Sequence, residues 1–164
     1  MNFSIRPAVP NDIPDILKLT YSGIHIWGED IVDKLKTYHL DVTCSYADMT
    51  ARFNDRNNLF FVAELDGKTV GTVYVNIENG ETAHMGGLYC SIRGGGLGTT
   101  LLRHAMDQAS NAGSHQMECT IYENNIPSIS LMKKYGANYC AEEVWDDVRY
   151  VSYRFDLSRI LVSA

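Results

Sequence analysis

Several features that would indicate particular classes of protein are missing from this chain of 164 residues. No apolar run approaches the roughly 18 residues that a membrane-spanning helix needs, so the sequence predicts no membrane span. The cysteines lie far apart and form no C-x-x-C pair: Cys44, Cys90, Cys119 and Cys140. This spacing argues against a zinc site and a disulfide framework, and it suits a reducing cytosol. We therefore expect a cytoplasmic protein that needs no metal.

Positive charge is also scarce. The chain has 14 lysines and arginines against 20 acidic residues, so its net charge is −6, with a pI near 5.3. An acidic chain is a poor nucleic-acid binder, although it could favour a cationic substrate. The hydrophobic content of 45% and the charged content of 21% are ordinary for a globular protein. The length fits one domain over residues 1–164, with enough chain for a substantial core.

Glycine, by contrast, is concentrated in one short stretch, Gly94-Gly95-Gly96-Leu97-Gly98. An apolar run precedes this stretch, and apolar residues at helical spacing follow it: Leu97, Leu101, Leu102, Ala105, Met106 and Ala109. The glycines therefore lie between a strand and the first turn of a helix, where unpaired N–H groups and a partial positive charge favour an anion. Glycine lets a phosphate come close, Arg93 adds a cation, and Thr99 and Thr100 add hydroxyl donors. We interpret the stretch as a phosphate or pyrophosphate cradle; a flexible connector is the alternative.

The spacing within the loop distinguishes between kinds of cradle. A P-loop needs a lysine after its last glycine, and no lysine follows the glycines here. A Rossmann fingerprint needs a third glycine at Thr99 or Leu101, where none occurs. What remains is Arg93 followed by the glycines to Gly98. This pattern resembles the [Arg/Gln]-x-x-Gly-x-[Gly/Ala] acyl-CoA loop of the GNAT N-acetyltransferase superfamily.

The order of the expected elements supports the resemblance. Strand patterns and turn residues such as Asp66-Gly67 predict strands at 3–8, 59–65, 68–77, 81–88, 116–122, 138–144 and 148–157. Helical patterns predict helices at 12–27, 31–53 with a break near 43–46, 97–112 and 125–135. This is the GNAT order, and it implies an α/β (α+β) fold. Such a fold has a mixed central sheet of about seven strands, helices on both faces, and a splay between the fourth and fifth strands. A monomer or a homodimer would suit it, because exposed sheet edges in this architecture often pair.

A second motif begins at Asn125 and looks like the family's N-x-x-A-x-x-L-Y-x-x-x-G-F helix. Asn125, Leu131 and Gly136 match the motif, whereas Ser128, Met132 and Ala137 depart from it. In many members the tyrosine at the position of Met132 protonates the departing CoA thiolate, which methionine cannot do. Either another group acts, with Tyr135, Tyr89 and Tyr122 as candidates, or the thiolate leaves unassisted or through water.

The resemblance implies acetyl-CoA as cosubstrate and assigns residues to it. The backbone of Leu88, Tyr89 and Cys90 would pair with the pantetheine amides like an added strand. The loop would wrap the pyrophosphate through Arg93, Gly94, Gly95, Gly96, Leu97, Gly98 and Thr99. Asn125 would contact the pantetheine arm, Ser128 would add a hydrogen bond, and Met132 could pack against the arm.

The implied reaction is direct attack of a primary amine on the thioester, for which a base is needed. Strand alternation predicts one shared face for Thr82, His84, Gly86 and Leu88. His84 then lies two steps from the acetyl group, and an ordinary histidine pKa of about 6.5 suits a base. A hydrogen-bonded sheet histidine is the alternative, and Glu118 is a second candidate base. A covalent route through Cys90 or Cys119 lacks a neighbouring histidine, so we interpret Cys119 as a buried cysteine.

Two acidic segments, each with a tryptophan, are candidates for binding the acceptor. The residues are Trp27, Glu29 and Asp30 in the first segment, and Trp145 and Asp146 in the second. Ion pairs and cation–π contacts there could hold an amine-bearing small molecule or peptide, although solvated surface segments are the alternative. The sequence therefore predicts an acetyl-CoA-dependent N-acetyltransferase. The alternative is a CoA-binding sensor or regulatory protein without turnover, for which Met132 is the only motive.

Overall fold

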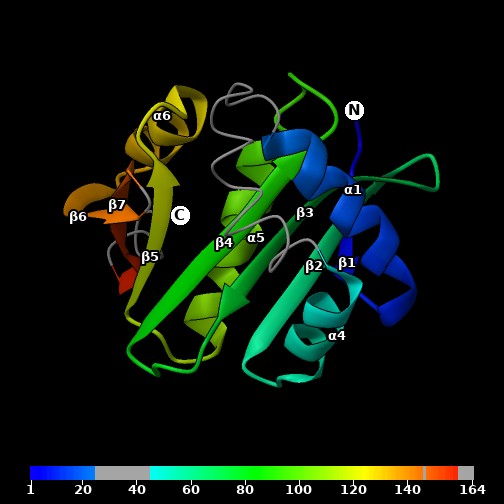
Figure 1. The fold of residues 1–164 in the computed structure, drawn as a ribbon, viewed down its shortest axis with the longest axis horizontal. Coiled ribbons are helices and arrows are strands. Elements are labelled where there is room, and N and C mark those ends of the chain that lie inside the picture. The colour runs from blue at the N-terminus through cyan, green and yellow to red at the C-terminus, as the bar shows by residue number, and fades with distance from the viewer. Residues whose placement is uncertain (25–44, 146, 159–164) are drawn as a thin grey trace.

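A seven-stranded sheet forms the centre of the protein in the computed structural model, which describes residues 1–24, 45–145 and 147–158 (Figure 1). The strand order is β1-β2-β3-β4-β5-β7-β6, and every neighbouring pair is antiparallel except β4 and β5. The strands are β1 (Ser4–Pro7), β2 (Asn58–Leu65), β3 (Lys68–Asn76), β4 (Thr82–Cys90), β5 (Gln116–Tyr122), β6 (Asn138–Trp145) and β7 (Val148–Asp156). The expected mixed sheet is therefore confirmed.

Helices cover both faces of this sheet, as expected. They are α1 (Ile13–Ile24), α4 (Tyr46–Asn54), α5 (Leu97–Asn111) and α6 (Ile126–Lys134), with a short 3₁₀ turn, η1 (Pro10–Asp12), before α1. Strand β2 shows which helices cover which face of the sheet, because alternate residues of a strand point to opposite faces. Phe61 and Ala63 pack in the core beneath α5, whereas Phe60 and Val62 pack against residues of α1 and α4.

Local signals explain where several elements begin and end. Asp66 (φ 52°) and Gly67 (φ 75°) form the expected two-residue hairpin between β2 and β3. Helix α4 begins after Ser45, whose hydroxyl accepts a hydrogen bond from the Asp48 N–H at 3.1 Å. That start agrees with the break expected near residues 43–46. The rest of the two expected N-terminal helices, residues 25–44, lies outside the described residues.

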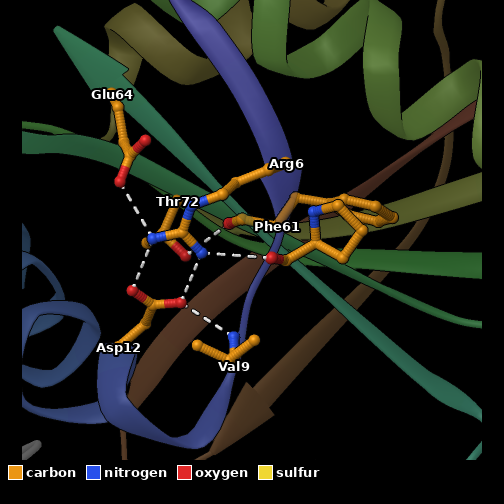
Figure 2. A network of polar contacts seen from close by, with 7 residues as sticks. Arg6, Val9, Asp12, Phe61, Glu64 and Thr72 are labelled. Carbon is orange, nitrogen blue, oxygen red and sulfur yellow. Dashed lines mark hydrogen bonds and ion pairs between the residues drawn. The ribbon is translucent and has the colours of Figure 1, made fainter. Parts of the chain in front are cut away.

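A polar network fastens the N-terminal segment to the sheet (Figure 2). The Arg6 guanidinium donates two hydrogen bonds to the Asp12 carboxylate, at 2.7 and 2.9 Å, and one to Glu64 at 2.9 Å. Asp12 also accepts a hydrogen bond from the Val9 N–H at 2.7 Å. The Arg6 hydrogen bonds hold the pKa of Asp12 below its usual range. The Arg6 guanidinium of β1 thus joins the largely buried Asp12 carboxylate of η1 to Glu64 of β2.

The parallel strands β4 and β5 separate part-way along their length. Thr82–Met85 of β4 pair with Gln116–Cys119 of β5, and the ladder between these strands ends there. Beyond that point β4 keeps its pairing with β3 through Gly86, Tyr89 and Cys90. Its other edge therefore opens toward β5, which confirms the expected splay between the fourth and fifth strands. In the parts of the chain described, no helix is long and apolar enough to cross a membrane.

Candidate active site

A β-bulge in β4 sets the direction of every side chain around the splay. Tyr74 of β3 pairs with Gly86, and Thr72, two residues earlier, pairs with Tyr89, three residues later. The extra residue in β4 is accommodated at Gly87, whose φ of 59° suits glycine. Residues on either side of such an insertion no longer follow simple alternation. Tyr89 therefore shares a face with His84 and Gly86.

Leu88 consequently points the other way, and the expectation that it shares a face with His84 is wrong. Leu88 packs against the core beneath α5, on the same side as Ala83 and Met85. His84 is exposed on the opposite side, which carries α1 and α4. In a regular strand His84 and Leu88 would share a face, but the inserted Gly87 reverses the facing of every residue that follows it.

A cleft of about 410 Å³ lies at the open end of β4, between the glycine loop and the start of α6. Gly94, Gly95 and Gly96 all have positive φ values of 78°, 68° and 78°, so the curl of the loop requires glycine. Gly96 is the N-cap of α5 and has no side chain to bond the first N–H groups of that helix. Those donors are left available for an anion, and a diphosphate fits the cradle that they form.

Most of the residues assigned to the cofactor from the sequence lie along this one cleft. They are Leu88, Tyr89, Cys90, Arg93, Gly94, Gly96, Leu97, Gly98, Thr99, Asn125 and Ser128. The Asn125 side chain is oriented by its role as N-cap of α6, where it accepts a hydrogen bond from the Ser128 N–H at 3.4 Å. Sequence reasoning missed Gly23, Ile92, Pro127 and Leu131, which complete the lining. Gly23 could not have been found, because it comes from distant α1.

Two assigned residues lie elsewhere. A Cβ at Gly95 would come 3.1 Å from the Met1 side chain, so this glycine turns toward the N-terminus. Met132 is only 1% exposed and belongs to the core beneath α5, so its side chain does not line the cleft. The expected packing of Met132 against the pantetheine arm is therefore not what the structure shows. Its helix turns this position inward, onto the sheet.

A second cavity, of about 530 Å³, lies on the other side of β4. Aromatic side chains from five strands line it: Phe60, Tyr74, Tyr89, Tyr150 and Trp145. Trp145 packs on Tyr150 with ring centroids 5.0 Å apart, and Glu143 lies beside them in the lining. Trp145, proposed from the sequence for acceptor binding, therefore lines this cavity. Trp27, Glu29, Asp30 and Asp146 lie outside the described residues.

The three catalytic candidates are placed very differently. His84 lines the second cavity. Glu118 lies next to His84 across the β4–β5 pairing, but it forms an ion pair with Arg154, whose Nε lies 2.8 Å from Glu118 Oε1. Glu118 also lines neither cavity, so it is poorly placed to act as a base.

Tyr135 is the C-cap of α6 and packs beside the start of α5. Its hydroxyl donates to Thr99 Oγ1 at 3.4 Å, which lowers the pKa of Tyr135, and the Arg103 guanidinium lies 5.4 Å from its ring. Thr99 and Arg103 both belong to the N-terminal part of α5, so the Tyr135 side chain lies beside the start of that helix. Tyr89, by contrast, lines both cavities and so lies between them.

The cysteines do not resemble activated nucleophiles. Burial raises the pKa of Cys90 to about 11 and that of Cys119 to about 12. Cys119 is 2% exposed, and its thiol donates to the Tyr153 carbonyl at 3.7 Å. The interpretation of Cys119 as a buried cysteine is confirmed by this low exposure.

Comparison with known proteins identifies the family. A family model described as acetyltransferase (GNAT) family matches residues 26–137. The chain belongs to the GNAT acetyltransferase family. The resemblance read from the glycine loop is thereby confirmed, and membership makes this GNAT protein an acyltransferase of the N-acetyltransferase class.

Solved structures agree on the fold of this GNAT protein. The yncA protein of Salmonella typhimurium, described with its cofactor acetyl-CoA, is 22% identical with a TM-score of 0.73, covering 96% of this chain and 95% of that one. An N-acetyltransferase from Staphylococcus aureus Mu50 is also 22% identical, with a TM-score of 0.77 and coverage of 96% and 99%. The spermidine/spermine N-acetyltransferase SpeG of Vibrio cholerae is 14% identical, with a TM-score of 0.74 and coverage of 98% and 97%.

Proposed function

We propose that this GNAT protein moves the acetyl group of acetyl-CoA to a primary amine of a small molecule or peptide, by direct attack of the amine on the thioester. One observation carries the proposal. Tyr89 lines both the cleft that holds the anion cradle and the aromatic cavity on the other side of β4. A donor in the first and an acceptor in the second would therefore meet beside the bulge at Gly87.

The first cleft suits acetyl-CoA, which supplies the acetyl group as a thioester. The N–H groups at the start of α5, together with Arg93 and Thr99, would hold its pyrophosphate. The β4 segment 86–90 has an edge open toward β5, so the backbone from Leu88 to Cys90 can pair with pantetheine amides as an added strand would. This pairing would set how far the thioester extends along the cleft toward Gly87.

The side chains beside the bulge account for the proton movements. A bond forms between the amine nitrogen and the acetyl carbon, the carbon–sulfur bond breaks, and the amine loses a proton. His84 faces the acceptor cavity and takes that proton, directly or through water. Because Met132 is buried and cannot donate, we assign protonation of the thiolate to Tyr89.

Thiol release tests the proposal. The protein is mixed with acetyl-CoA and a panel of amines (polyamines, aminoglycosides, amino acids and short peptides), and free CoA is detected with a thiol reagent. Release that depends on one class of amine supports the proposal. No release across the panel, with acetyl-CoA binding measured by calorimetry, would contradict it and would favour the alternative of a CoA-binding sensor.

A further inference from the structure

An arginine lies in the aromatic acceptor cavity. Arg52, in the last turn of α4, lines this cavity and is partly buried. Its guanidinium carbon lies 4.6 Å from the centre of the Tyr74 ring and 5.4 Å from that of Phe60. Phe60 in turn packs on Tyr74, with ring centroids 5.4 Å apart. The cation is thus held against the wall of the cavity by two aromatic rings.

This guanidinium has no carboxylate partner in the described parts of the chain. The ion pairs there are made by Arg6, Arg149 and Arg154. Contacts with ring faces do not use the N–H groups at the edge of the guanidinium, which form a planar fork that matches a carboxylate. A partly desolvated cation with unused donors is a place where an anionic group is bound strongly.

The position of Arg52 relates this anion site to the reacting centre. A Cβ at Gly86 would come 2.6 Å from the Tyr74 hydroxyl, and one at Gly87 would come 3.0 Å from the same ring. The Tyr74 ring therefore lies on the backbone of the bulge, and Arg52 lies on the Tyr74 ring. A small molecule can thus contact Arg52 while another of its groups reaches the place where the two cavities meet.

We propose that the acceptor carries a carboxylate as well as its amine, and so is an α-amino acid or a close analogue. Arg52 binds the carboxylate, the aromatic rings contact the side chain, and the amine faces His84 and the bulge. This inference rests on the proposed function, whose acceptor it narrows. A fixed cation in the cavity would also disfavour polyamines and other acceptors with several positive charges.

Matched acceptors test this inference. The rate of CoA release is measured with apolar L-amino acids, with the amide of each, with the corresponding amine that lacks the carboxyl group, and with spermidine. We expect kcat/KM to be about 10- to 100-fold higher for the acids than for their amides, as a charge-assisted pair implies. The substitution Arg52→Gln should lower kcat/KM for the acids by this factor and for the amides much less, so that the difference between acids and amides disappears. The control is Arg56→Gln, an exposed arginine in the turn before β2, which should change neither value.

Equal rates for acids and amides in the wild type would overturn the inference while leaving the proposed transferase intact. An equal loss for both in Arg52→Gln would also overturn it, because a purely structural role predicts that result. Binding gives a readout that is independent of turnover. Calorimetric titration of the CoA-loaded protein with the same amino acids should show binding that Arg52→Gln abolishes. If this binding is seen without release of CoA from any amine, the proposed function fails but the carboxylate site stands.

Discussion

His84 and Leu88 lie on opposite faces of β4, although they are four positions apart and a regular strand would place them on one face. The bulge at Gly87 produces this reversal. As a result, one face of β4 packs in the core and the other lines a cavity. Leu88 anchors the strand in the core beneath α5, while His84 and Tyr89 face the acceptor cavity. A single inserted residue thereby brings the strand edge proposed for the cofactor next to the cavity proposed for the acceptor.

The first prediction concerns the anion cradle. Gly96→Asp should weaken CoA binding by about tenfold or more, because a negative charge would enter the positive end of the α5 dipole. Calorimetric titration with CoA measures the effect. The matched control is Gly67→Asp, which adds the same charge at another positive-φ glycine, in the β2–β3 hairpin. If both variants bind CoA equally well, the loop is not the cradle.

The second prediction concerns the base. His84→Ala should lower kcat by about 100-fold or more and remove the acidic limb of its pH profile, since a general base must be deprotonated to act. CoA affinity should not change, because His84 lies outside the cofactor cleft. His115→Ala, at an exposed histidine before β5, serves as the control. Unaltered kinetics in His84→Ala would remove His84 as the base.

The third prediction distinguishes direct transfer from an acyl-cysteine route. Cys90→Ala and Cys119→Ala should each keep kcat within about threefold of the wild type, because burial raises both thiol pKa values far above neutrality. Mass spectrometry after incubation with acetyl-CoA alone should find no acetylated protein. Loss of turnover in either variant, together with an acetylated cysteine in the wild type, would establish the covalent route instead.

The fourth prediction concerns stability and pH. Asp12→Asn should lower the free energy of unfolding by about 1–3 kcal/mol at pH 7, because it removes a charge-assisted pair with Arg6. Arg6 lowers the pKa of Asp12 in the folded state, so the folded protein binds fewer protons than the unfolded chain. The stabilisation is therefore complete above the ordinary aspartate pKa of about 4 and is lost as the pH falls through the lowered value.

Urea unfolding at pH 7 and at pH 3 measures this dependence. The difference between wild type and Asp12→Asn should shrink at the lower pH, and the exposed Asp15→Asn should show little change at either. A difference that stays constant with pH would show that the ion pair does not contribute as a charge.

Much of the fold could be predicted because its signals are local. The Asp66-Gly67 turn and the glycines before α5 act on neighbouring residues, and each was found at its place. The order of elements then implied the splayed sheet. The site was harder to predict from the sequence. The ion pair of Glu118 with Arg154 and the burial of Met132 in the core arise only when distant segments pack together.

The sequence by itself determined the order of strands and helices along the chain, the glycine loop before α5 and the family, because backbone conformation at turns and helix starts depends on a few adjacent residues. Only the tertiary structure decided which side chains share a cavity. The bulge at Gly87 depends on pairing with β3, and Arg52 reaches Tyr74 because α4 packs across β2. Such relationships depend on register and packing between segments far apart in the chain, and no local pattern specifies them.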